Sequence, residues 1–249
     1  MVDFVGAGCG AADLITVRGM KLTGNADVLI YAGSLVSPDL LKYAKKDCEI
    51  YDSSRMDLEE IIGVMKSAEE RGLNTVRLQT GDLSLYGALR EQTDRLAKLG
   101  IPYRITPGVS SMFGAAAALG AEYTLPGVSQ SVVITRMTGR TEVPGKEGIA
   151  QFAAHGCTMV IFLSAGMTRE VSDELQKGGL APETPAAIVY RATWEDEKVC
   201  RCTVGTLHEK AAANGITKTA LIIVGNVLGT DYELSRLYDK TFETGYRKP

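Results

Sequence analysis

Three glycine-containing turns each follow a short apolar run that is typical of a buried strand. The first is GAGCG at residues 6–10, the second is TGDLSLYG at residues 80–87 and the third is TPGVSS at residues 106–111. Glycine lets the backbone approach a ligand closely, and a helix that begins after such a turn offers unpaired N–H groups. We therefore expect all three turns to open at the carboxyl edge of one parallel sheet and to form a ligand site there.

The second and third turns carry polar side chains that suit a ligand with hydroxyl or cationic groups. Gly81 permits a tight bend, and Asp82 places a carboxylate at the mouth of the sheet. Ser110 and Ser111 stand where an alanine-rich helix begins. Helix capping explains Asp82 and one of the serines equally well without any ligand. The sequence leaves both explanations open.

Short runs rich in β-branched residues alternate with helical patterns along the chain, which is typical of an α/β protein with mainly parallel strands. The pattern predicts strands at 2–5, 27–31, 75–79, 103–106, 131–135, 158–163, 186–190, 199–203 and 219–224. Helices are predicted at 57–70, where Asp57 and Glu60 fit a capping box, at 85–99 and at 110–119. We therefore predict two α/β domains, residues 1–112 and 113–249.

The composition fits a soluble globular protein, with 249 residues of which 45% are hydrophobic and 23% are charged. The net charge is −3 and no basic block is present, which argues against a nucleic-acid partner. The longest uncharged stretch is shorter than the roughly 20 residues of a membrane helix. Because the first residues lack the basic region of a secretion signal, we expect a cytoplasmic protein without a membrane partner.

Five cysteines form no CxxC pair, and the chain has only two histidines, His155 and His208. Cys200 and Cys202 share a predicted strand, but neither histidine is near them in the sequence. We expect reduced thiols and no metal site.

The first turn also fits the dinucleotide fingerprint G-x-G-x-x-A through Gly6, Gly8 and Ala11. A nicotinamide dinucleotide site further needs an acidic residue at the end of the second strand. Here that strand has its acid, Asp27, at the opposite end. An NAD(P)-dependent oxidoreductase is therefore an alternative that lacks its distinguishing residue.

Five segments, in this order and spacing, resemble the successive motifs of the tetrapyrrole (corrin and porphyrin) methylases. They are GAGCGAADLIT at 6–16, TGDLSLYG at 80–87, TPGVSS at 106–111, VIFLSAG at 160–166 and TALIIVGN at 219–226. The segments at 31–41, 126–144 and 190–199 look most like the branch that methylates C-11 of precorrin-4 or cobalt-precorrin-4 in cobalamin biosynthesis.

The resemblance implies two α/β domains with a cofactor cleft between them, a homodimer, and S-adenosyl-L-methionine as cofactor. Carried over by position, the cofactor-binding residues are Cys9, Gly81, Asp82, Leu85, Tyr86, Ser110, Ser111, Leu163 and Ala192. Cys9 stands where the family commonly has proline, and Leu83 replaces the proline of its Gly-Asp-Pro motif. These changes alter the turn but remove no side chain that does chemistry.

Methyl transfer from a sulfonium to carbon is an in-line displacement, so the protein has chiefly to align the reactants in a dry site. We therefore name no catalytic nucleophile or general base. Because the implied tetrapyrrole substrate carries many carboxylates, arginines should bind it. The candidates are Arg136 and Arg140, followed by Arg55 and Arg191.

Two further alternatives stay open at this point. A sibling methylase would share the cofactor site and act at another position of the macrocycle. A catalytically silent binding protein would have to carry the same cofactor motifs without using them.

Overall fold

The computed structural model describes residues 1–235 and 238–247 and divides into two compact units. The first unit consists of Met1–Ala115 with Arg191–Glu197, and the second of Ala116–Tyr190 with Lys198–Pro249. The sequence predicts a boundary at residue 112 and assigns the segment Arg191–Glu197 to the second domain. In the structure that segment packs with the first unit.

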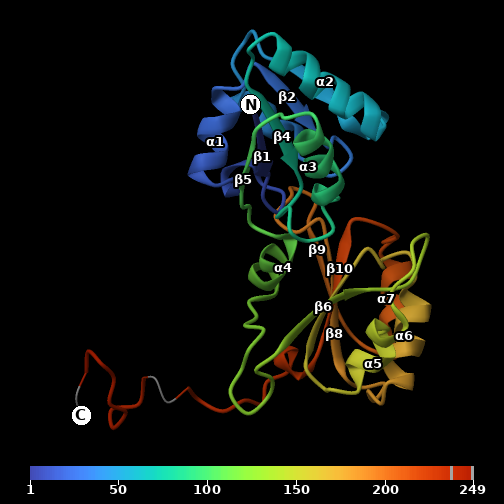
Figure 1. The fold of residues 1–249 in the computed structure, drawn as a ribbon. Coiled ribbons are helices and arrows are strands. Elements are labelled where there is room, and N and C mark those ends of the chain that lie inside the picture. Colours follow the sequence, from blue (N-terminus) through green and yellow to red (C-terminus); the bar gives the residue numbers. More distant parts are fainter. Residues whose placement is uncertain (236–237, 248–249) are drawn as a thin grey trace. The chain divides into compact units, whose positions relative to one another are not determined.

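The first unit contains a five-stranded sheet with the order β3-β2-β4-β1-β5, in which every pairing is parallel. Helices α2 and α3 cover one face, and α1 lies on the other, as Figure 1 shows. The strands are β1 (Val2–Gly6), β2 (Val28–Tyr31), β3 (Glu49–Asp52), β4 (Thr75–Gln79) and β5 (Tyr103–Thr106). The helices are α1 (Val17–Gly24), α2 (Leu58–Glu70), α3 (Leu89–Lys98) and α4 (Ser111–Leu119), and α4 continues into the second unit.

The second unit contains a five-stranded sheet with the order β6-β7-β10-β8-β9. Helices α5, α6 and α7 gather on one face of it (Figure 1), over a core that includes Ile161, Val171 and Leu207. The strands are β6 (Val132–Arg136), β7 (Thr158–Phe162), β8 (Pro185–Tyr190), β9 (Lys198–Thr203) and β10 (Ala220–Val224). The helices are α5 (Ile149–Ala153), α6 (Thr168–Lys177) and α7 (Leu207–Ala213).

Most predicted elements are confirmed, and two predictions are corrected. The strands of the second unit are not mainly parallel, because only the β6–β7 pairing is parallel and β10 pairs antiparallel with both β7 and β8. The helix predicted from Leu85 begins only at Leu89. The edge strand β3 and the helices α1, α5, α6 and α7 were not predicted. The capping box of α2 is confirmed, since Asp57 and Glu60 each accept a backbone N–H of the other.

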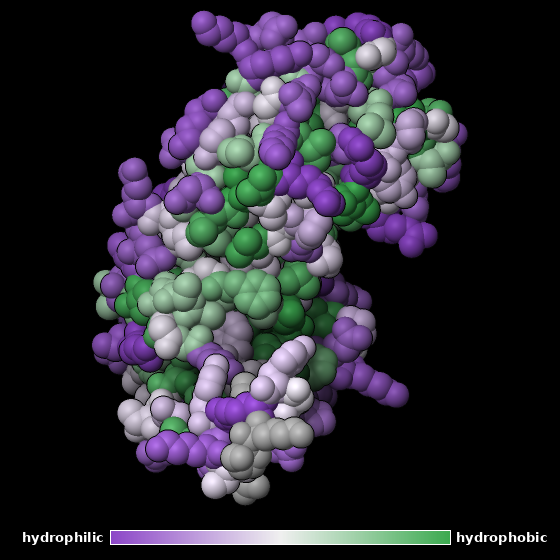
Figure 2. Space-filling model, turned by 90° about the vertical axis from the view of Figure 1, so that its left-hand side faces the viewer, coloured by the Kyte–Doolittle hydropathy of each residue, from purple (hydrophilic) through white to green (hydrophobic). Residues whose placement is uncertain are grey.

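Several large apolar side chains are exposed at the surface. On the face in Figure 2, hydrophobic residues form connected areas bordered by hydrophilic ones. In the first unit Val17 is 67% exposed, Ile105 49% and Phe113 57%. Among the described residues, no helix is both long and apolar enough to span a membrane.

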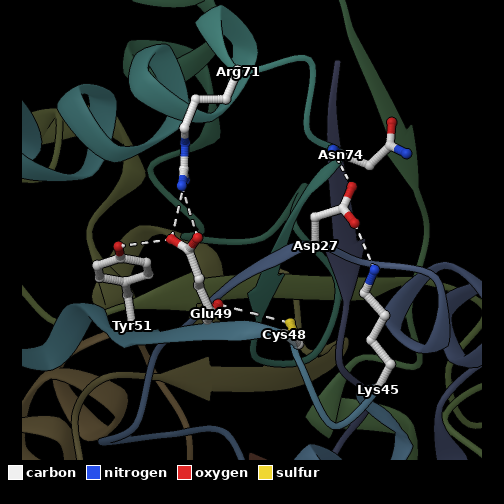
Figure 3. Close-up of polar contacts among 7 residues, drawn as sticks. All are labelled: Asp27, Lys45, Cys48, Glu49, Tyr51, Arg71 and Asn74. Atoms are coloured by element: carbon white, nitrogen blue, oxygen red, sulfur yellow. Dashed lines mark hydrogen bonds and ion pairs between the residues drawn. The ribbon is translucent and has the colours of Figure 1, made fainter.

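Ion pairs tie together the elements around β3 and the start of β2 (Figure 3). Asp27 accepts hydrogen bonds from Lys45 Nζ at 2.5 Å and from the backbone N–H of Asn74 at 2.8 Å. Glu49 of β3 accepts a bidentate pair from Arg71, at 2.8 and 3.0 Å, just beyond the end of α2. These contacts fix the edge strand and the loop before β4.

Candidate functional site

The first two glycine turns are joined directly by backbone hydrogen bonds. Gly81 donates to the carbonyl of Gly8 at 2.8 Å, and Gly8 donates to that of Gly81 at 3.4 Å. The two turns follow β1 and β4, which are parallel neighbours in the sheet. The expectation that these turns open at the same carboxyl edge is thus met in the first unit.

The third turn packs against both of them so tightly that only glycine fits. A Cβ on Gly108 would overlap the carbonyl oxygen of Gly81, and one on Gly6 would lie 2.5 Å from the nitrogen of Gly108. An ideal Cβ on Gly81 would lie 3.6 Å from the Cα of Ser110 and 3.6 Å from the nitrogen of Ser111, where α4 begins. The three turns therefore form a cradle of backbone, which we call the glycine cradle (Gly6, Gly8, Gly81 and Gly108).

Asp82 links the second turn to the third. Its Oδ2 accepts the backbone N–H of Gly108 at 2.9 Å, and its Oδ1 accepts the hydroxyl and the backbone N–H of Ser84. Burial on its own would raise the pKa of Asp82, but the hydrogen bonds from Ser84 and Gly108 outweigh it and lower the pKa. A carboxylate offers about four acceptor positions, so Asp82 can receive one more donor. It does not cap α3, which begins seven positions later at Leu89.

The two serines occupy different positions at the start of α4. Ser110 is buried, with 3% of its surface exposed, and its hydroxyl lies 3.5 Å from the backbone nitrogen of Met112. Ser111 is half-buried and is the first residue of the helix. At 3.5 Å the contact from Met112 is long for a hydrogen bond, so the Ser110 hydroxyl keeps capacity for another partner.

The segment Arg191–Glu197, here called the strap, packs on the first turn. The hydroxyl of Thr193 accepts the backbone N–H of Ala11 at 3.0 Å and lies 3.6 Å from the sulfur of Cys9. A Cβ on Gly10 would overlap the ring of Trp194 and lie 2.7 Å from the carbonyl oxygen of Ala192. The structure therefore brings Cys9 and Ala192, two predicted site residues, to the same turn.

Sequence reasoning missed Thr193 and Trp194. Trp194 is the single tryptophan of the chain, and both residues lie in the segment 190–199 that the sequence motifs had already singled out. Arg191 and Thr193 adopt the left-handed backbone region, at φ 46° and 68°, which is unfavourable for a β-branched residue such as Thr193. Strain of this kind persists only where surrounding contacts hold it.

Arg191 is largely occupied within the strap. Its guanidinium lies 4.0 Å from the ring centre of Trp194 and forms an ion pair with Asp196 at 2.6 Å. The predicted substrate role of Arg191 is thus in competition with a structural one.

Leu85 and Tyr86 lie in the turn between β4 and α3 rather than in a helix. Leu85 is half-buried and Tyr86 is 46% exposed, with Tyr86 in the left-handed region at φ 55°. Both come within four positions of Asp82 in the same turn, which places them beside the glycine cradle in the first unit.

Of the remaining predicted residues, Leu163, Arg136 and Arg140 belong to the second unit and Arg55 to the first. Leu163 follows β7 in the second unit, is 63% exposed and has a φ of 53°. In the same unit, Arg136 donates to the carbonyls of its own loop at Met137, Thr141 and Glu142, whereas Arg140 in that loop is exposed. Arg55 is exposed in the short helical turn Ser53–Arg55 of the first unit.

The described residues offer no alternative location for the site. The described part of the chain contains no cluster of three or more His, Cys, Asp or Glu side chains that could hold a metal ion. A surface depression of about 500 Å³ lies beside α2, with Tyr51, Met56, Val64 and Arg71 in its lining. It contains none of the predicted residues, and we place the candidate site at the glycine cradle.

Comparison with known proteins gives a consistent result. The family described as Tetrapyrrole (Corrin/Porphyrin) Methylases matches residues 1–208. A cobalt-precorrin-4 C(11)-methyltransferase of Methanocaldococcus jannaschii is 54% identical over 248 residues, covering 99% of this chain and 96% of the relative.

Solved structures agree in fold. An X-ray structure of cobalt precorrin-4 methyltransferase, a cobalamin biosynthetic enzyme, is 44% identical with a TM-score of 0.90, covering 92% of this chain and 96% of that one. A uroporphyrin-III C-methyltransferase of Thermus thermophilus, complexed with S-adenosyl homocysteine, is 25% identical with a TM-score of 0.77, covering 91% and 98%.

Proposed function

This chain belongs to the tetrapyrrole (corrin/porphyrin) methylases, and we propose that within the family it transfers a methyl group from S-adenosyl-L-methionine to C-11 of precorrin-4 or cobalt-precorrin-4 in cobalamin biosynthesis. The observation that carries the proposal is the 54% identity, over nearly the full length of both chains, to a cobalt-precorrin-4 C(11)-methyltransferase. The glycine cradle, with Asp82 and Ser110 beside it, supports the cofactor part of the proposal independently.

The residues of the first unit fit S-adenosylmethionine, which supplies an electrophilic methyl group when bound. The cradle leaves backbone rather than side chains at the ligand edge, as a close-lying polar cofactor requires. Asp82 has one acceptor position left for a hydroxyl or ammonium donor, and the Ser110 hydroxyl has capacity for another partner. Ser111 and Ala192 offer backbone groups beside the same turns.

Other residues would shape the cofactor site through contact. The family resemblance gives four such residues in the first unit, namely Cys9, Gly81, Leu85 and Tyr86. Leu163 of the second unit is carried over from the same resemblance, as a contact for the adenine region. The work of the chain is to bind and orient the reactants and to exclude water, and we propose no residue as general base.

For the substrate carboxylates we propose Arg136, Arg140, Arg55 and Arg191, of which Arg140 and Arg55 are exposed. Arg136 holds its own loop together through three carbonyls, so it would act by shaping the loop that carries Arg140. A guanidinium binds a carboxylate through two parallel hydrogen bonds, which suits a polycarboxylated macrocycle.

We further propose that the protein acts as a homodimer in the cytoplasm. The exposed apolar side chains Ile105 and Phe113 support a surface that is covered in an assembly. Light scattering behind a size-exclusion column measures the oligomeric state, and a monomer at micromolar concentration would contradict the dimer.

The function is tested in two steps. The purified protein is first titrated with S-adenosylhomocysteine and, as a control, with NADH; binding of the first alone supports a methyltransferase, and binding of NADH supports the oxidoreductase. The protein is then incubated with methyl-labelled S-adenosylmethionine and precorrin-4, with or without cobalt. Mass spectrometry measures methyl gain, and carbon NMR locates the label. Label at another macrocycle carbon would show a sibling methylase, and no methylation of either substrate would contradict the proposal.

A further inference from the structure

Three polar side chains are buried beneath the turn that carries Leu85 and Tyr86. Arg77 and Gln79 lie on β4, on the same face because they are two residues apart, and Gln92 lies on α3. Their exposed fractions are 5%, 8% and 4%. Such residues are unusual in an apolar core, because burying polar groups costs free energy unless each is fully hydrogen-bonded.

The two glutamines hold successive carbonyls of one turn. Gln79 Nε2 donates to the carbonyl of Gly87 at 2.7 Å, and Gln92 Nε2 donates to that of Ala88 at 3.0 Å. Arg77 in turn donates to Gln92 Oε1 at 3.3 Å and so orients the amide that reaches Ala88.

The turn that they hold is conformationally unfavourable. Tyr86 and Ala88, neither of which is glycine, both lie in the left-handed region, at φ 55° and 48°. Each such residue has to be held by its surroundings. The turn also connects directly to Asp82, which joins it to the glycine cradle.

Stability alone does not account for this cluster. Arg77 Nη1 donates to the carbonyls of Ile30 and Leu78, each at 3.4 Å, but no carboxylate pairs with Arg77 among the described ion pairs, and burial lowers its pKa to about 10. The Oε1 of Gln79 has no hydrogen-bond partner in the described structure. Apolar side chains at these positions would avoid burying an unpaired charge and an unpartnered oxygen. Core packing alone therefore does not explain the cluster.

We propose that Arg77, Gln79 and Gln92 are positioning residues of the cofactor site. They fix the carbonyls of Gly87 and Ala88, and thereby set the backbone that presents Leu85 and Tyr86. The inference rests on the proposed function, because it takes S-adenosylmethionine as the ligand of this turn.

Two variants separate positioning from packing. Gln79→Met keeps the length of the side chain and removes the donor to Gly87. Gln92→Glu keeps an acceptor for Arg77, and adds a negative charge beside it, but loses the donor to the Ala88 carbonyl. The matched control is Thr23→Val, because Thr23 is fully buried in α1 and its hydroxyl donates to the carbonyl of Gly19 at 2.9 Å.

The measurements are the melting temperature, the Kd for S-adenosylhomocysteine, and kcat and KM for S-adenosylmethionine. Gln79→Met and Gln92→Glu are expected to raise the Kd and KM about ten-fold, as the loss of one buried hydrogen bond suggests, with kcat at saturating cofactor much less affected. Gln92→Glu should have the melting temperature of the wild type. Thr23→Val should have a lower melting temperature and the wild-type Kd for S-adenosylhomocysteine.

The inference is overturned if both glutamine variants keep the wild-type Kd while their melting temperatures fall as in Thr23→Val. In that case the cluster serves packing alone, and the proposed function is untouched. A wild-type protein that fails to bind S-adenosylhomocysteine overturns the proposed function, and this inference with it.

Discussion

The carboxylate of Asp82 accepts the backbone N–H of Gly108, with 2.9 Å between Oδ2 and nitrogen, and so joins two turns that are 26 positions apart in the chain. The same carboxylate holds Ser84 through its other oxygen. Both oxygens therefore face N–H donors, and this fixes the orientation of the group beside the glycine cradle.

Asp82→Asn is expected to weaken binding of S-adenosylhomocysteine about ten-fold, because its NH₂ group must face one of these N–H donors. Calorimetric titration measures the effect. The control is Ser84→Ala, which removes one hydroxyl donor and leaves the bond to Gly108. Equal affinity of Asp82→Asn and wild type would exclude Asp82 from the cofactor site.

Gly108→Ala should disrupt the cradle, because the new methyl group would overlap the carbonyl of Gly81. Overpacking against backbone is expected to cost about 3 kcal/mol in the free energy of unfolding. Gly63→Ala is the matched control: Gly63 lies within α2 and a Cβ there meets no atom within 4 Å. It should stabilise the protein by about 0.5–1 kcal/mol. Urea denaturation measures the free energy of unfolding of both variants. A Gly108→Ala protein as stable as the wild type would refute the packing described.

Trp194 should report cofactor binding through its fluorescence, because its ring packs on Gly10 next to Cys9. It is the only tryptophan, so indole emission has a single source. We expect a saturable change during titration with S-adenosylhomocysteine, with the Kd found by calorimetry, and no such change in Trp194→Phe. Binding in the calorimeter with constant emission would place the ligand away from the strap.

Arg140→Ala should raise the KM for the tetrapyrrole about ten-fold, as expected for a lost charge-assisted hydrogen bond, and leave the Kd for S-adenosylhomocysteine unchanged. Arg136→Ala should also lower the melting temperature, since it frees three loop carbonyls. The control is Arg169→Ala, an exposed arginine of α6. Steady-state kinetics measure these KM values. If the KM of Arg140→Ala for the tetrapyrrole equals that of Arg169→Ala, Arg140 does not bind substrate.

The protein should lose stability in acid. The hydrogen bond from Lys45, followed by that from the Asn74 N–H, lowers the pKa of Asp27, and the bond from Arg71 lowers the pKa of Glu49. A carboxylate whose folded pKa is lowered stabilises the fold above its unfolded pKa of about 4, and this contribution is lost as the pH falls through the folded value.

Melting temperatures measured from pH 7 down to pH 3 check this expectation. Asp27→Asn should start lower at pH 7 and decline less steeply in acid than the wild type. On the alkaline side the bond to Asp27 raises the pKa of Lys45, so that contribution is lost as the pH rises through the raised value. Parallel acid profiles for the two proteins would show that Asp27 contributes nothing.

The sequence by itself determined the local features of this protein. The strands Thr75–Gln79 and Tyr103–Thr106, the capping box of α2 and the three turns after parallel strands were all predicted from short patterns. Each depends on residues within a few positions of one another, through side-chain periodicity, helix capping and the small size of glycine. The motifs were also sufficient to identify the family.

The tertiary structure alone decided which distant segments meet. The bond between Ala11 and Thr193 joins residues 182 positions apart, and the strand directions in the second sheet depend on pairing between β10 and its neighbours. No local pattern encodes such contacts, because they arise only when whole elements pack and bury their apolar faces. For the same reason the role of Gln79 and Gln92 under the turn at Tyr86 became visible only in the folded chain.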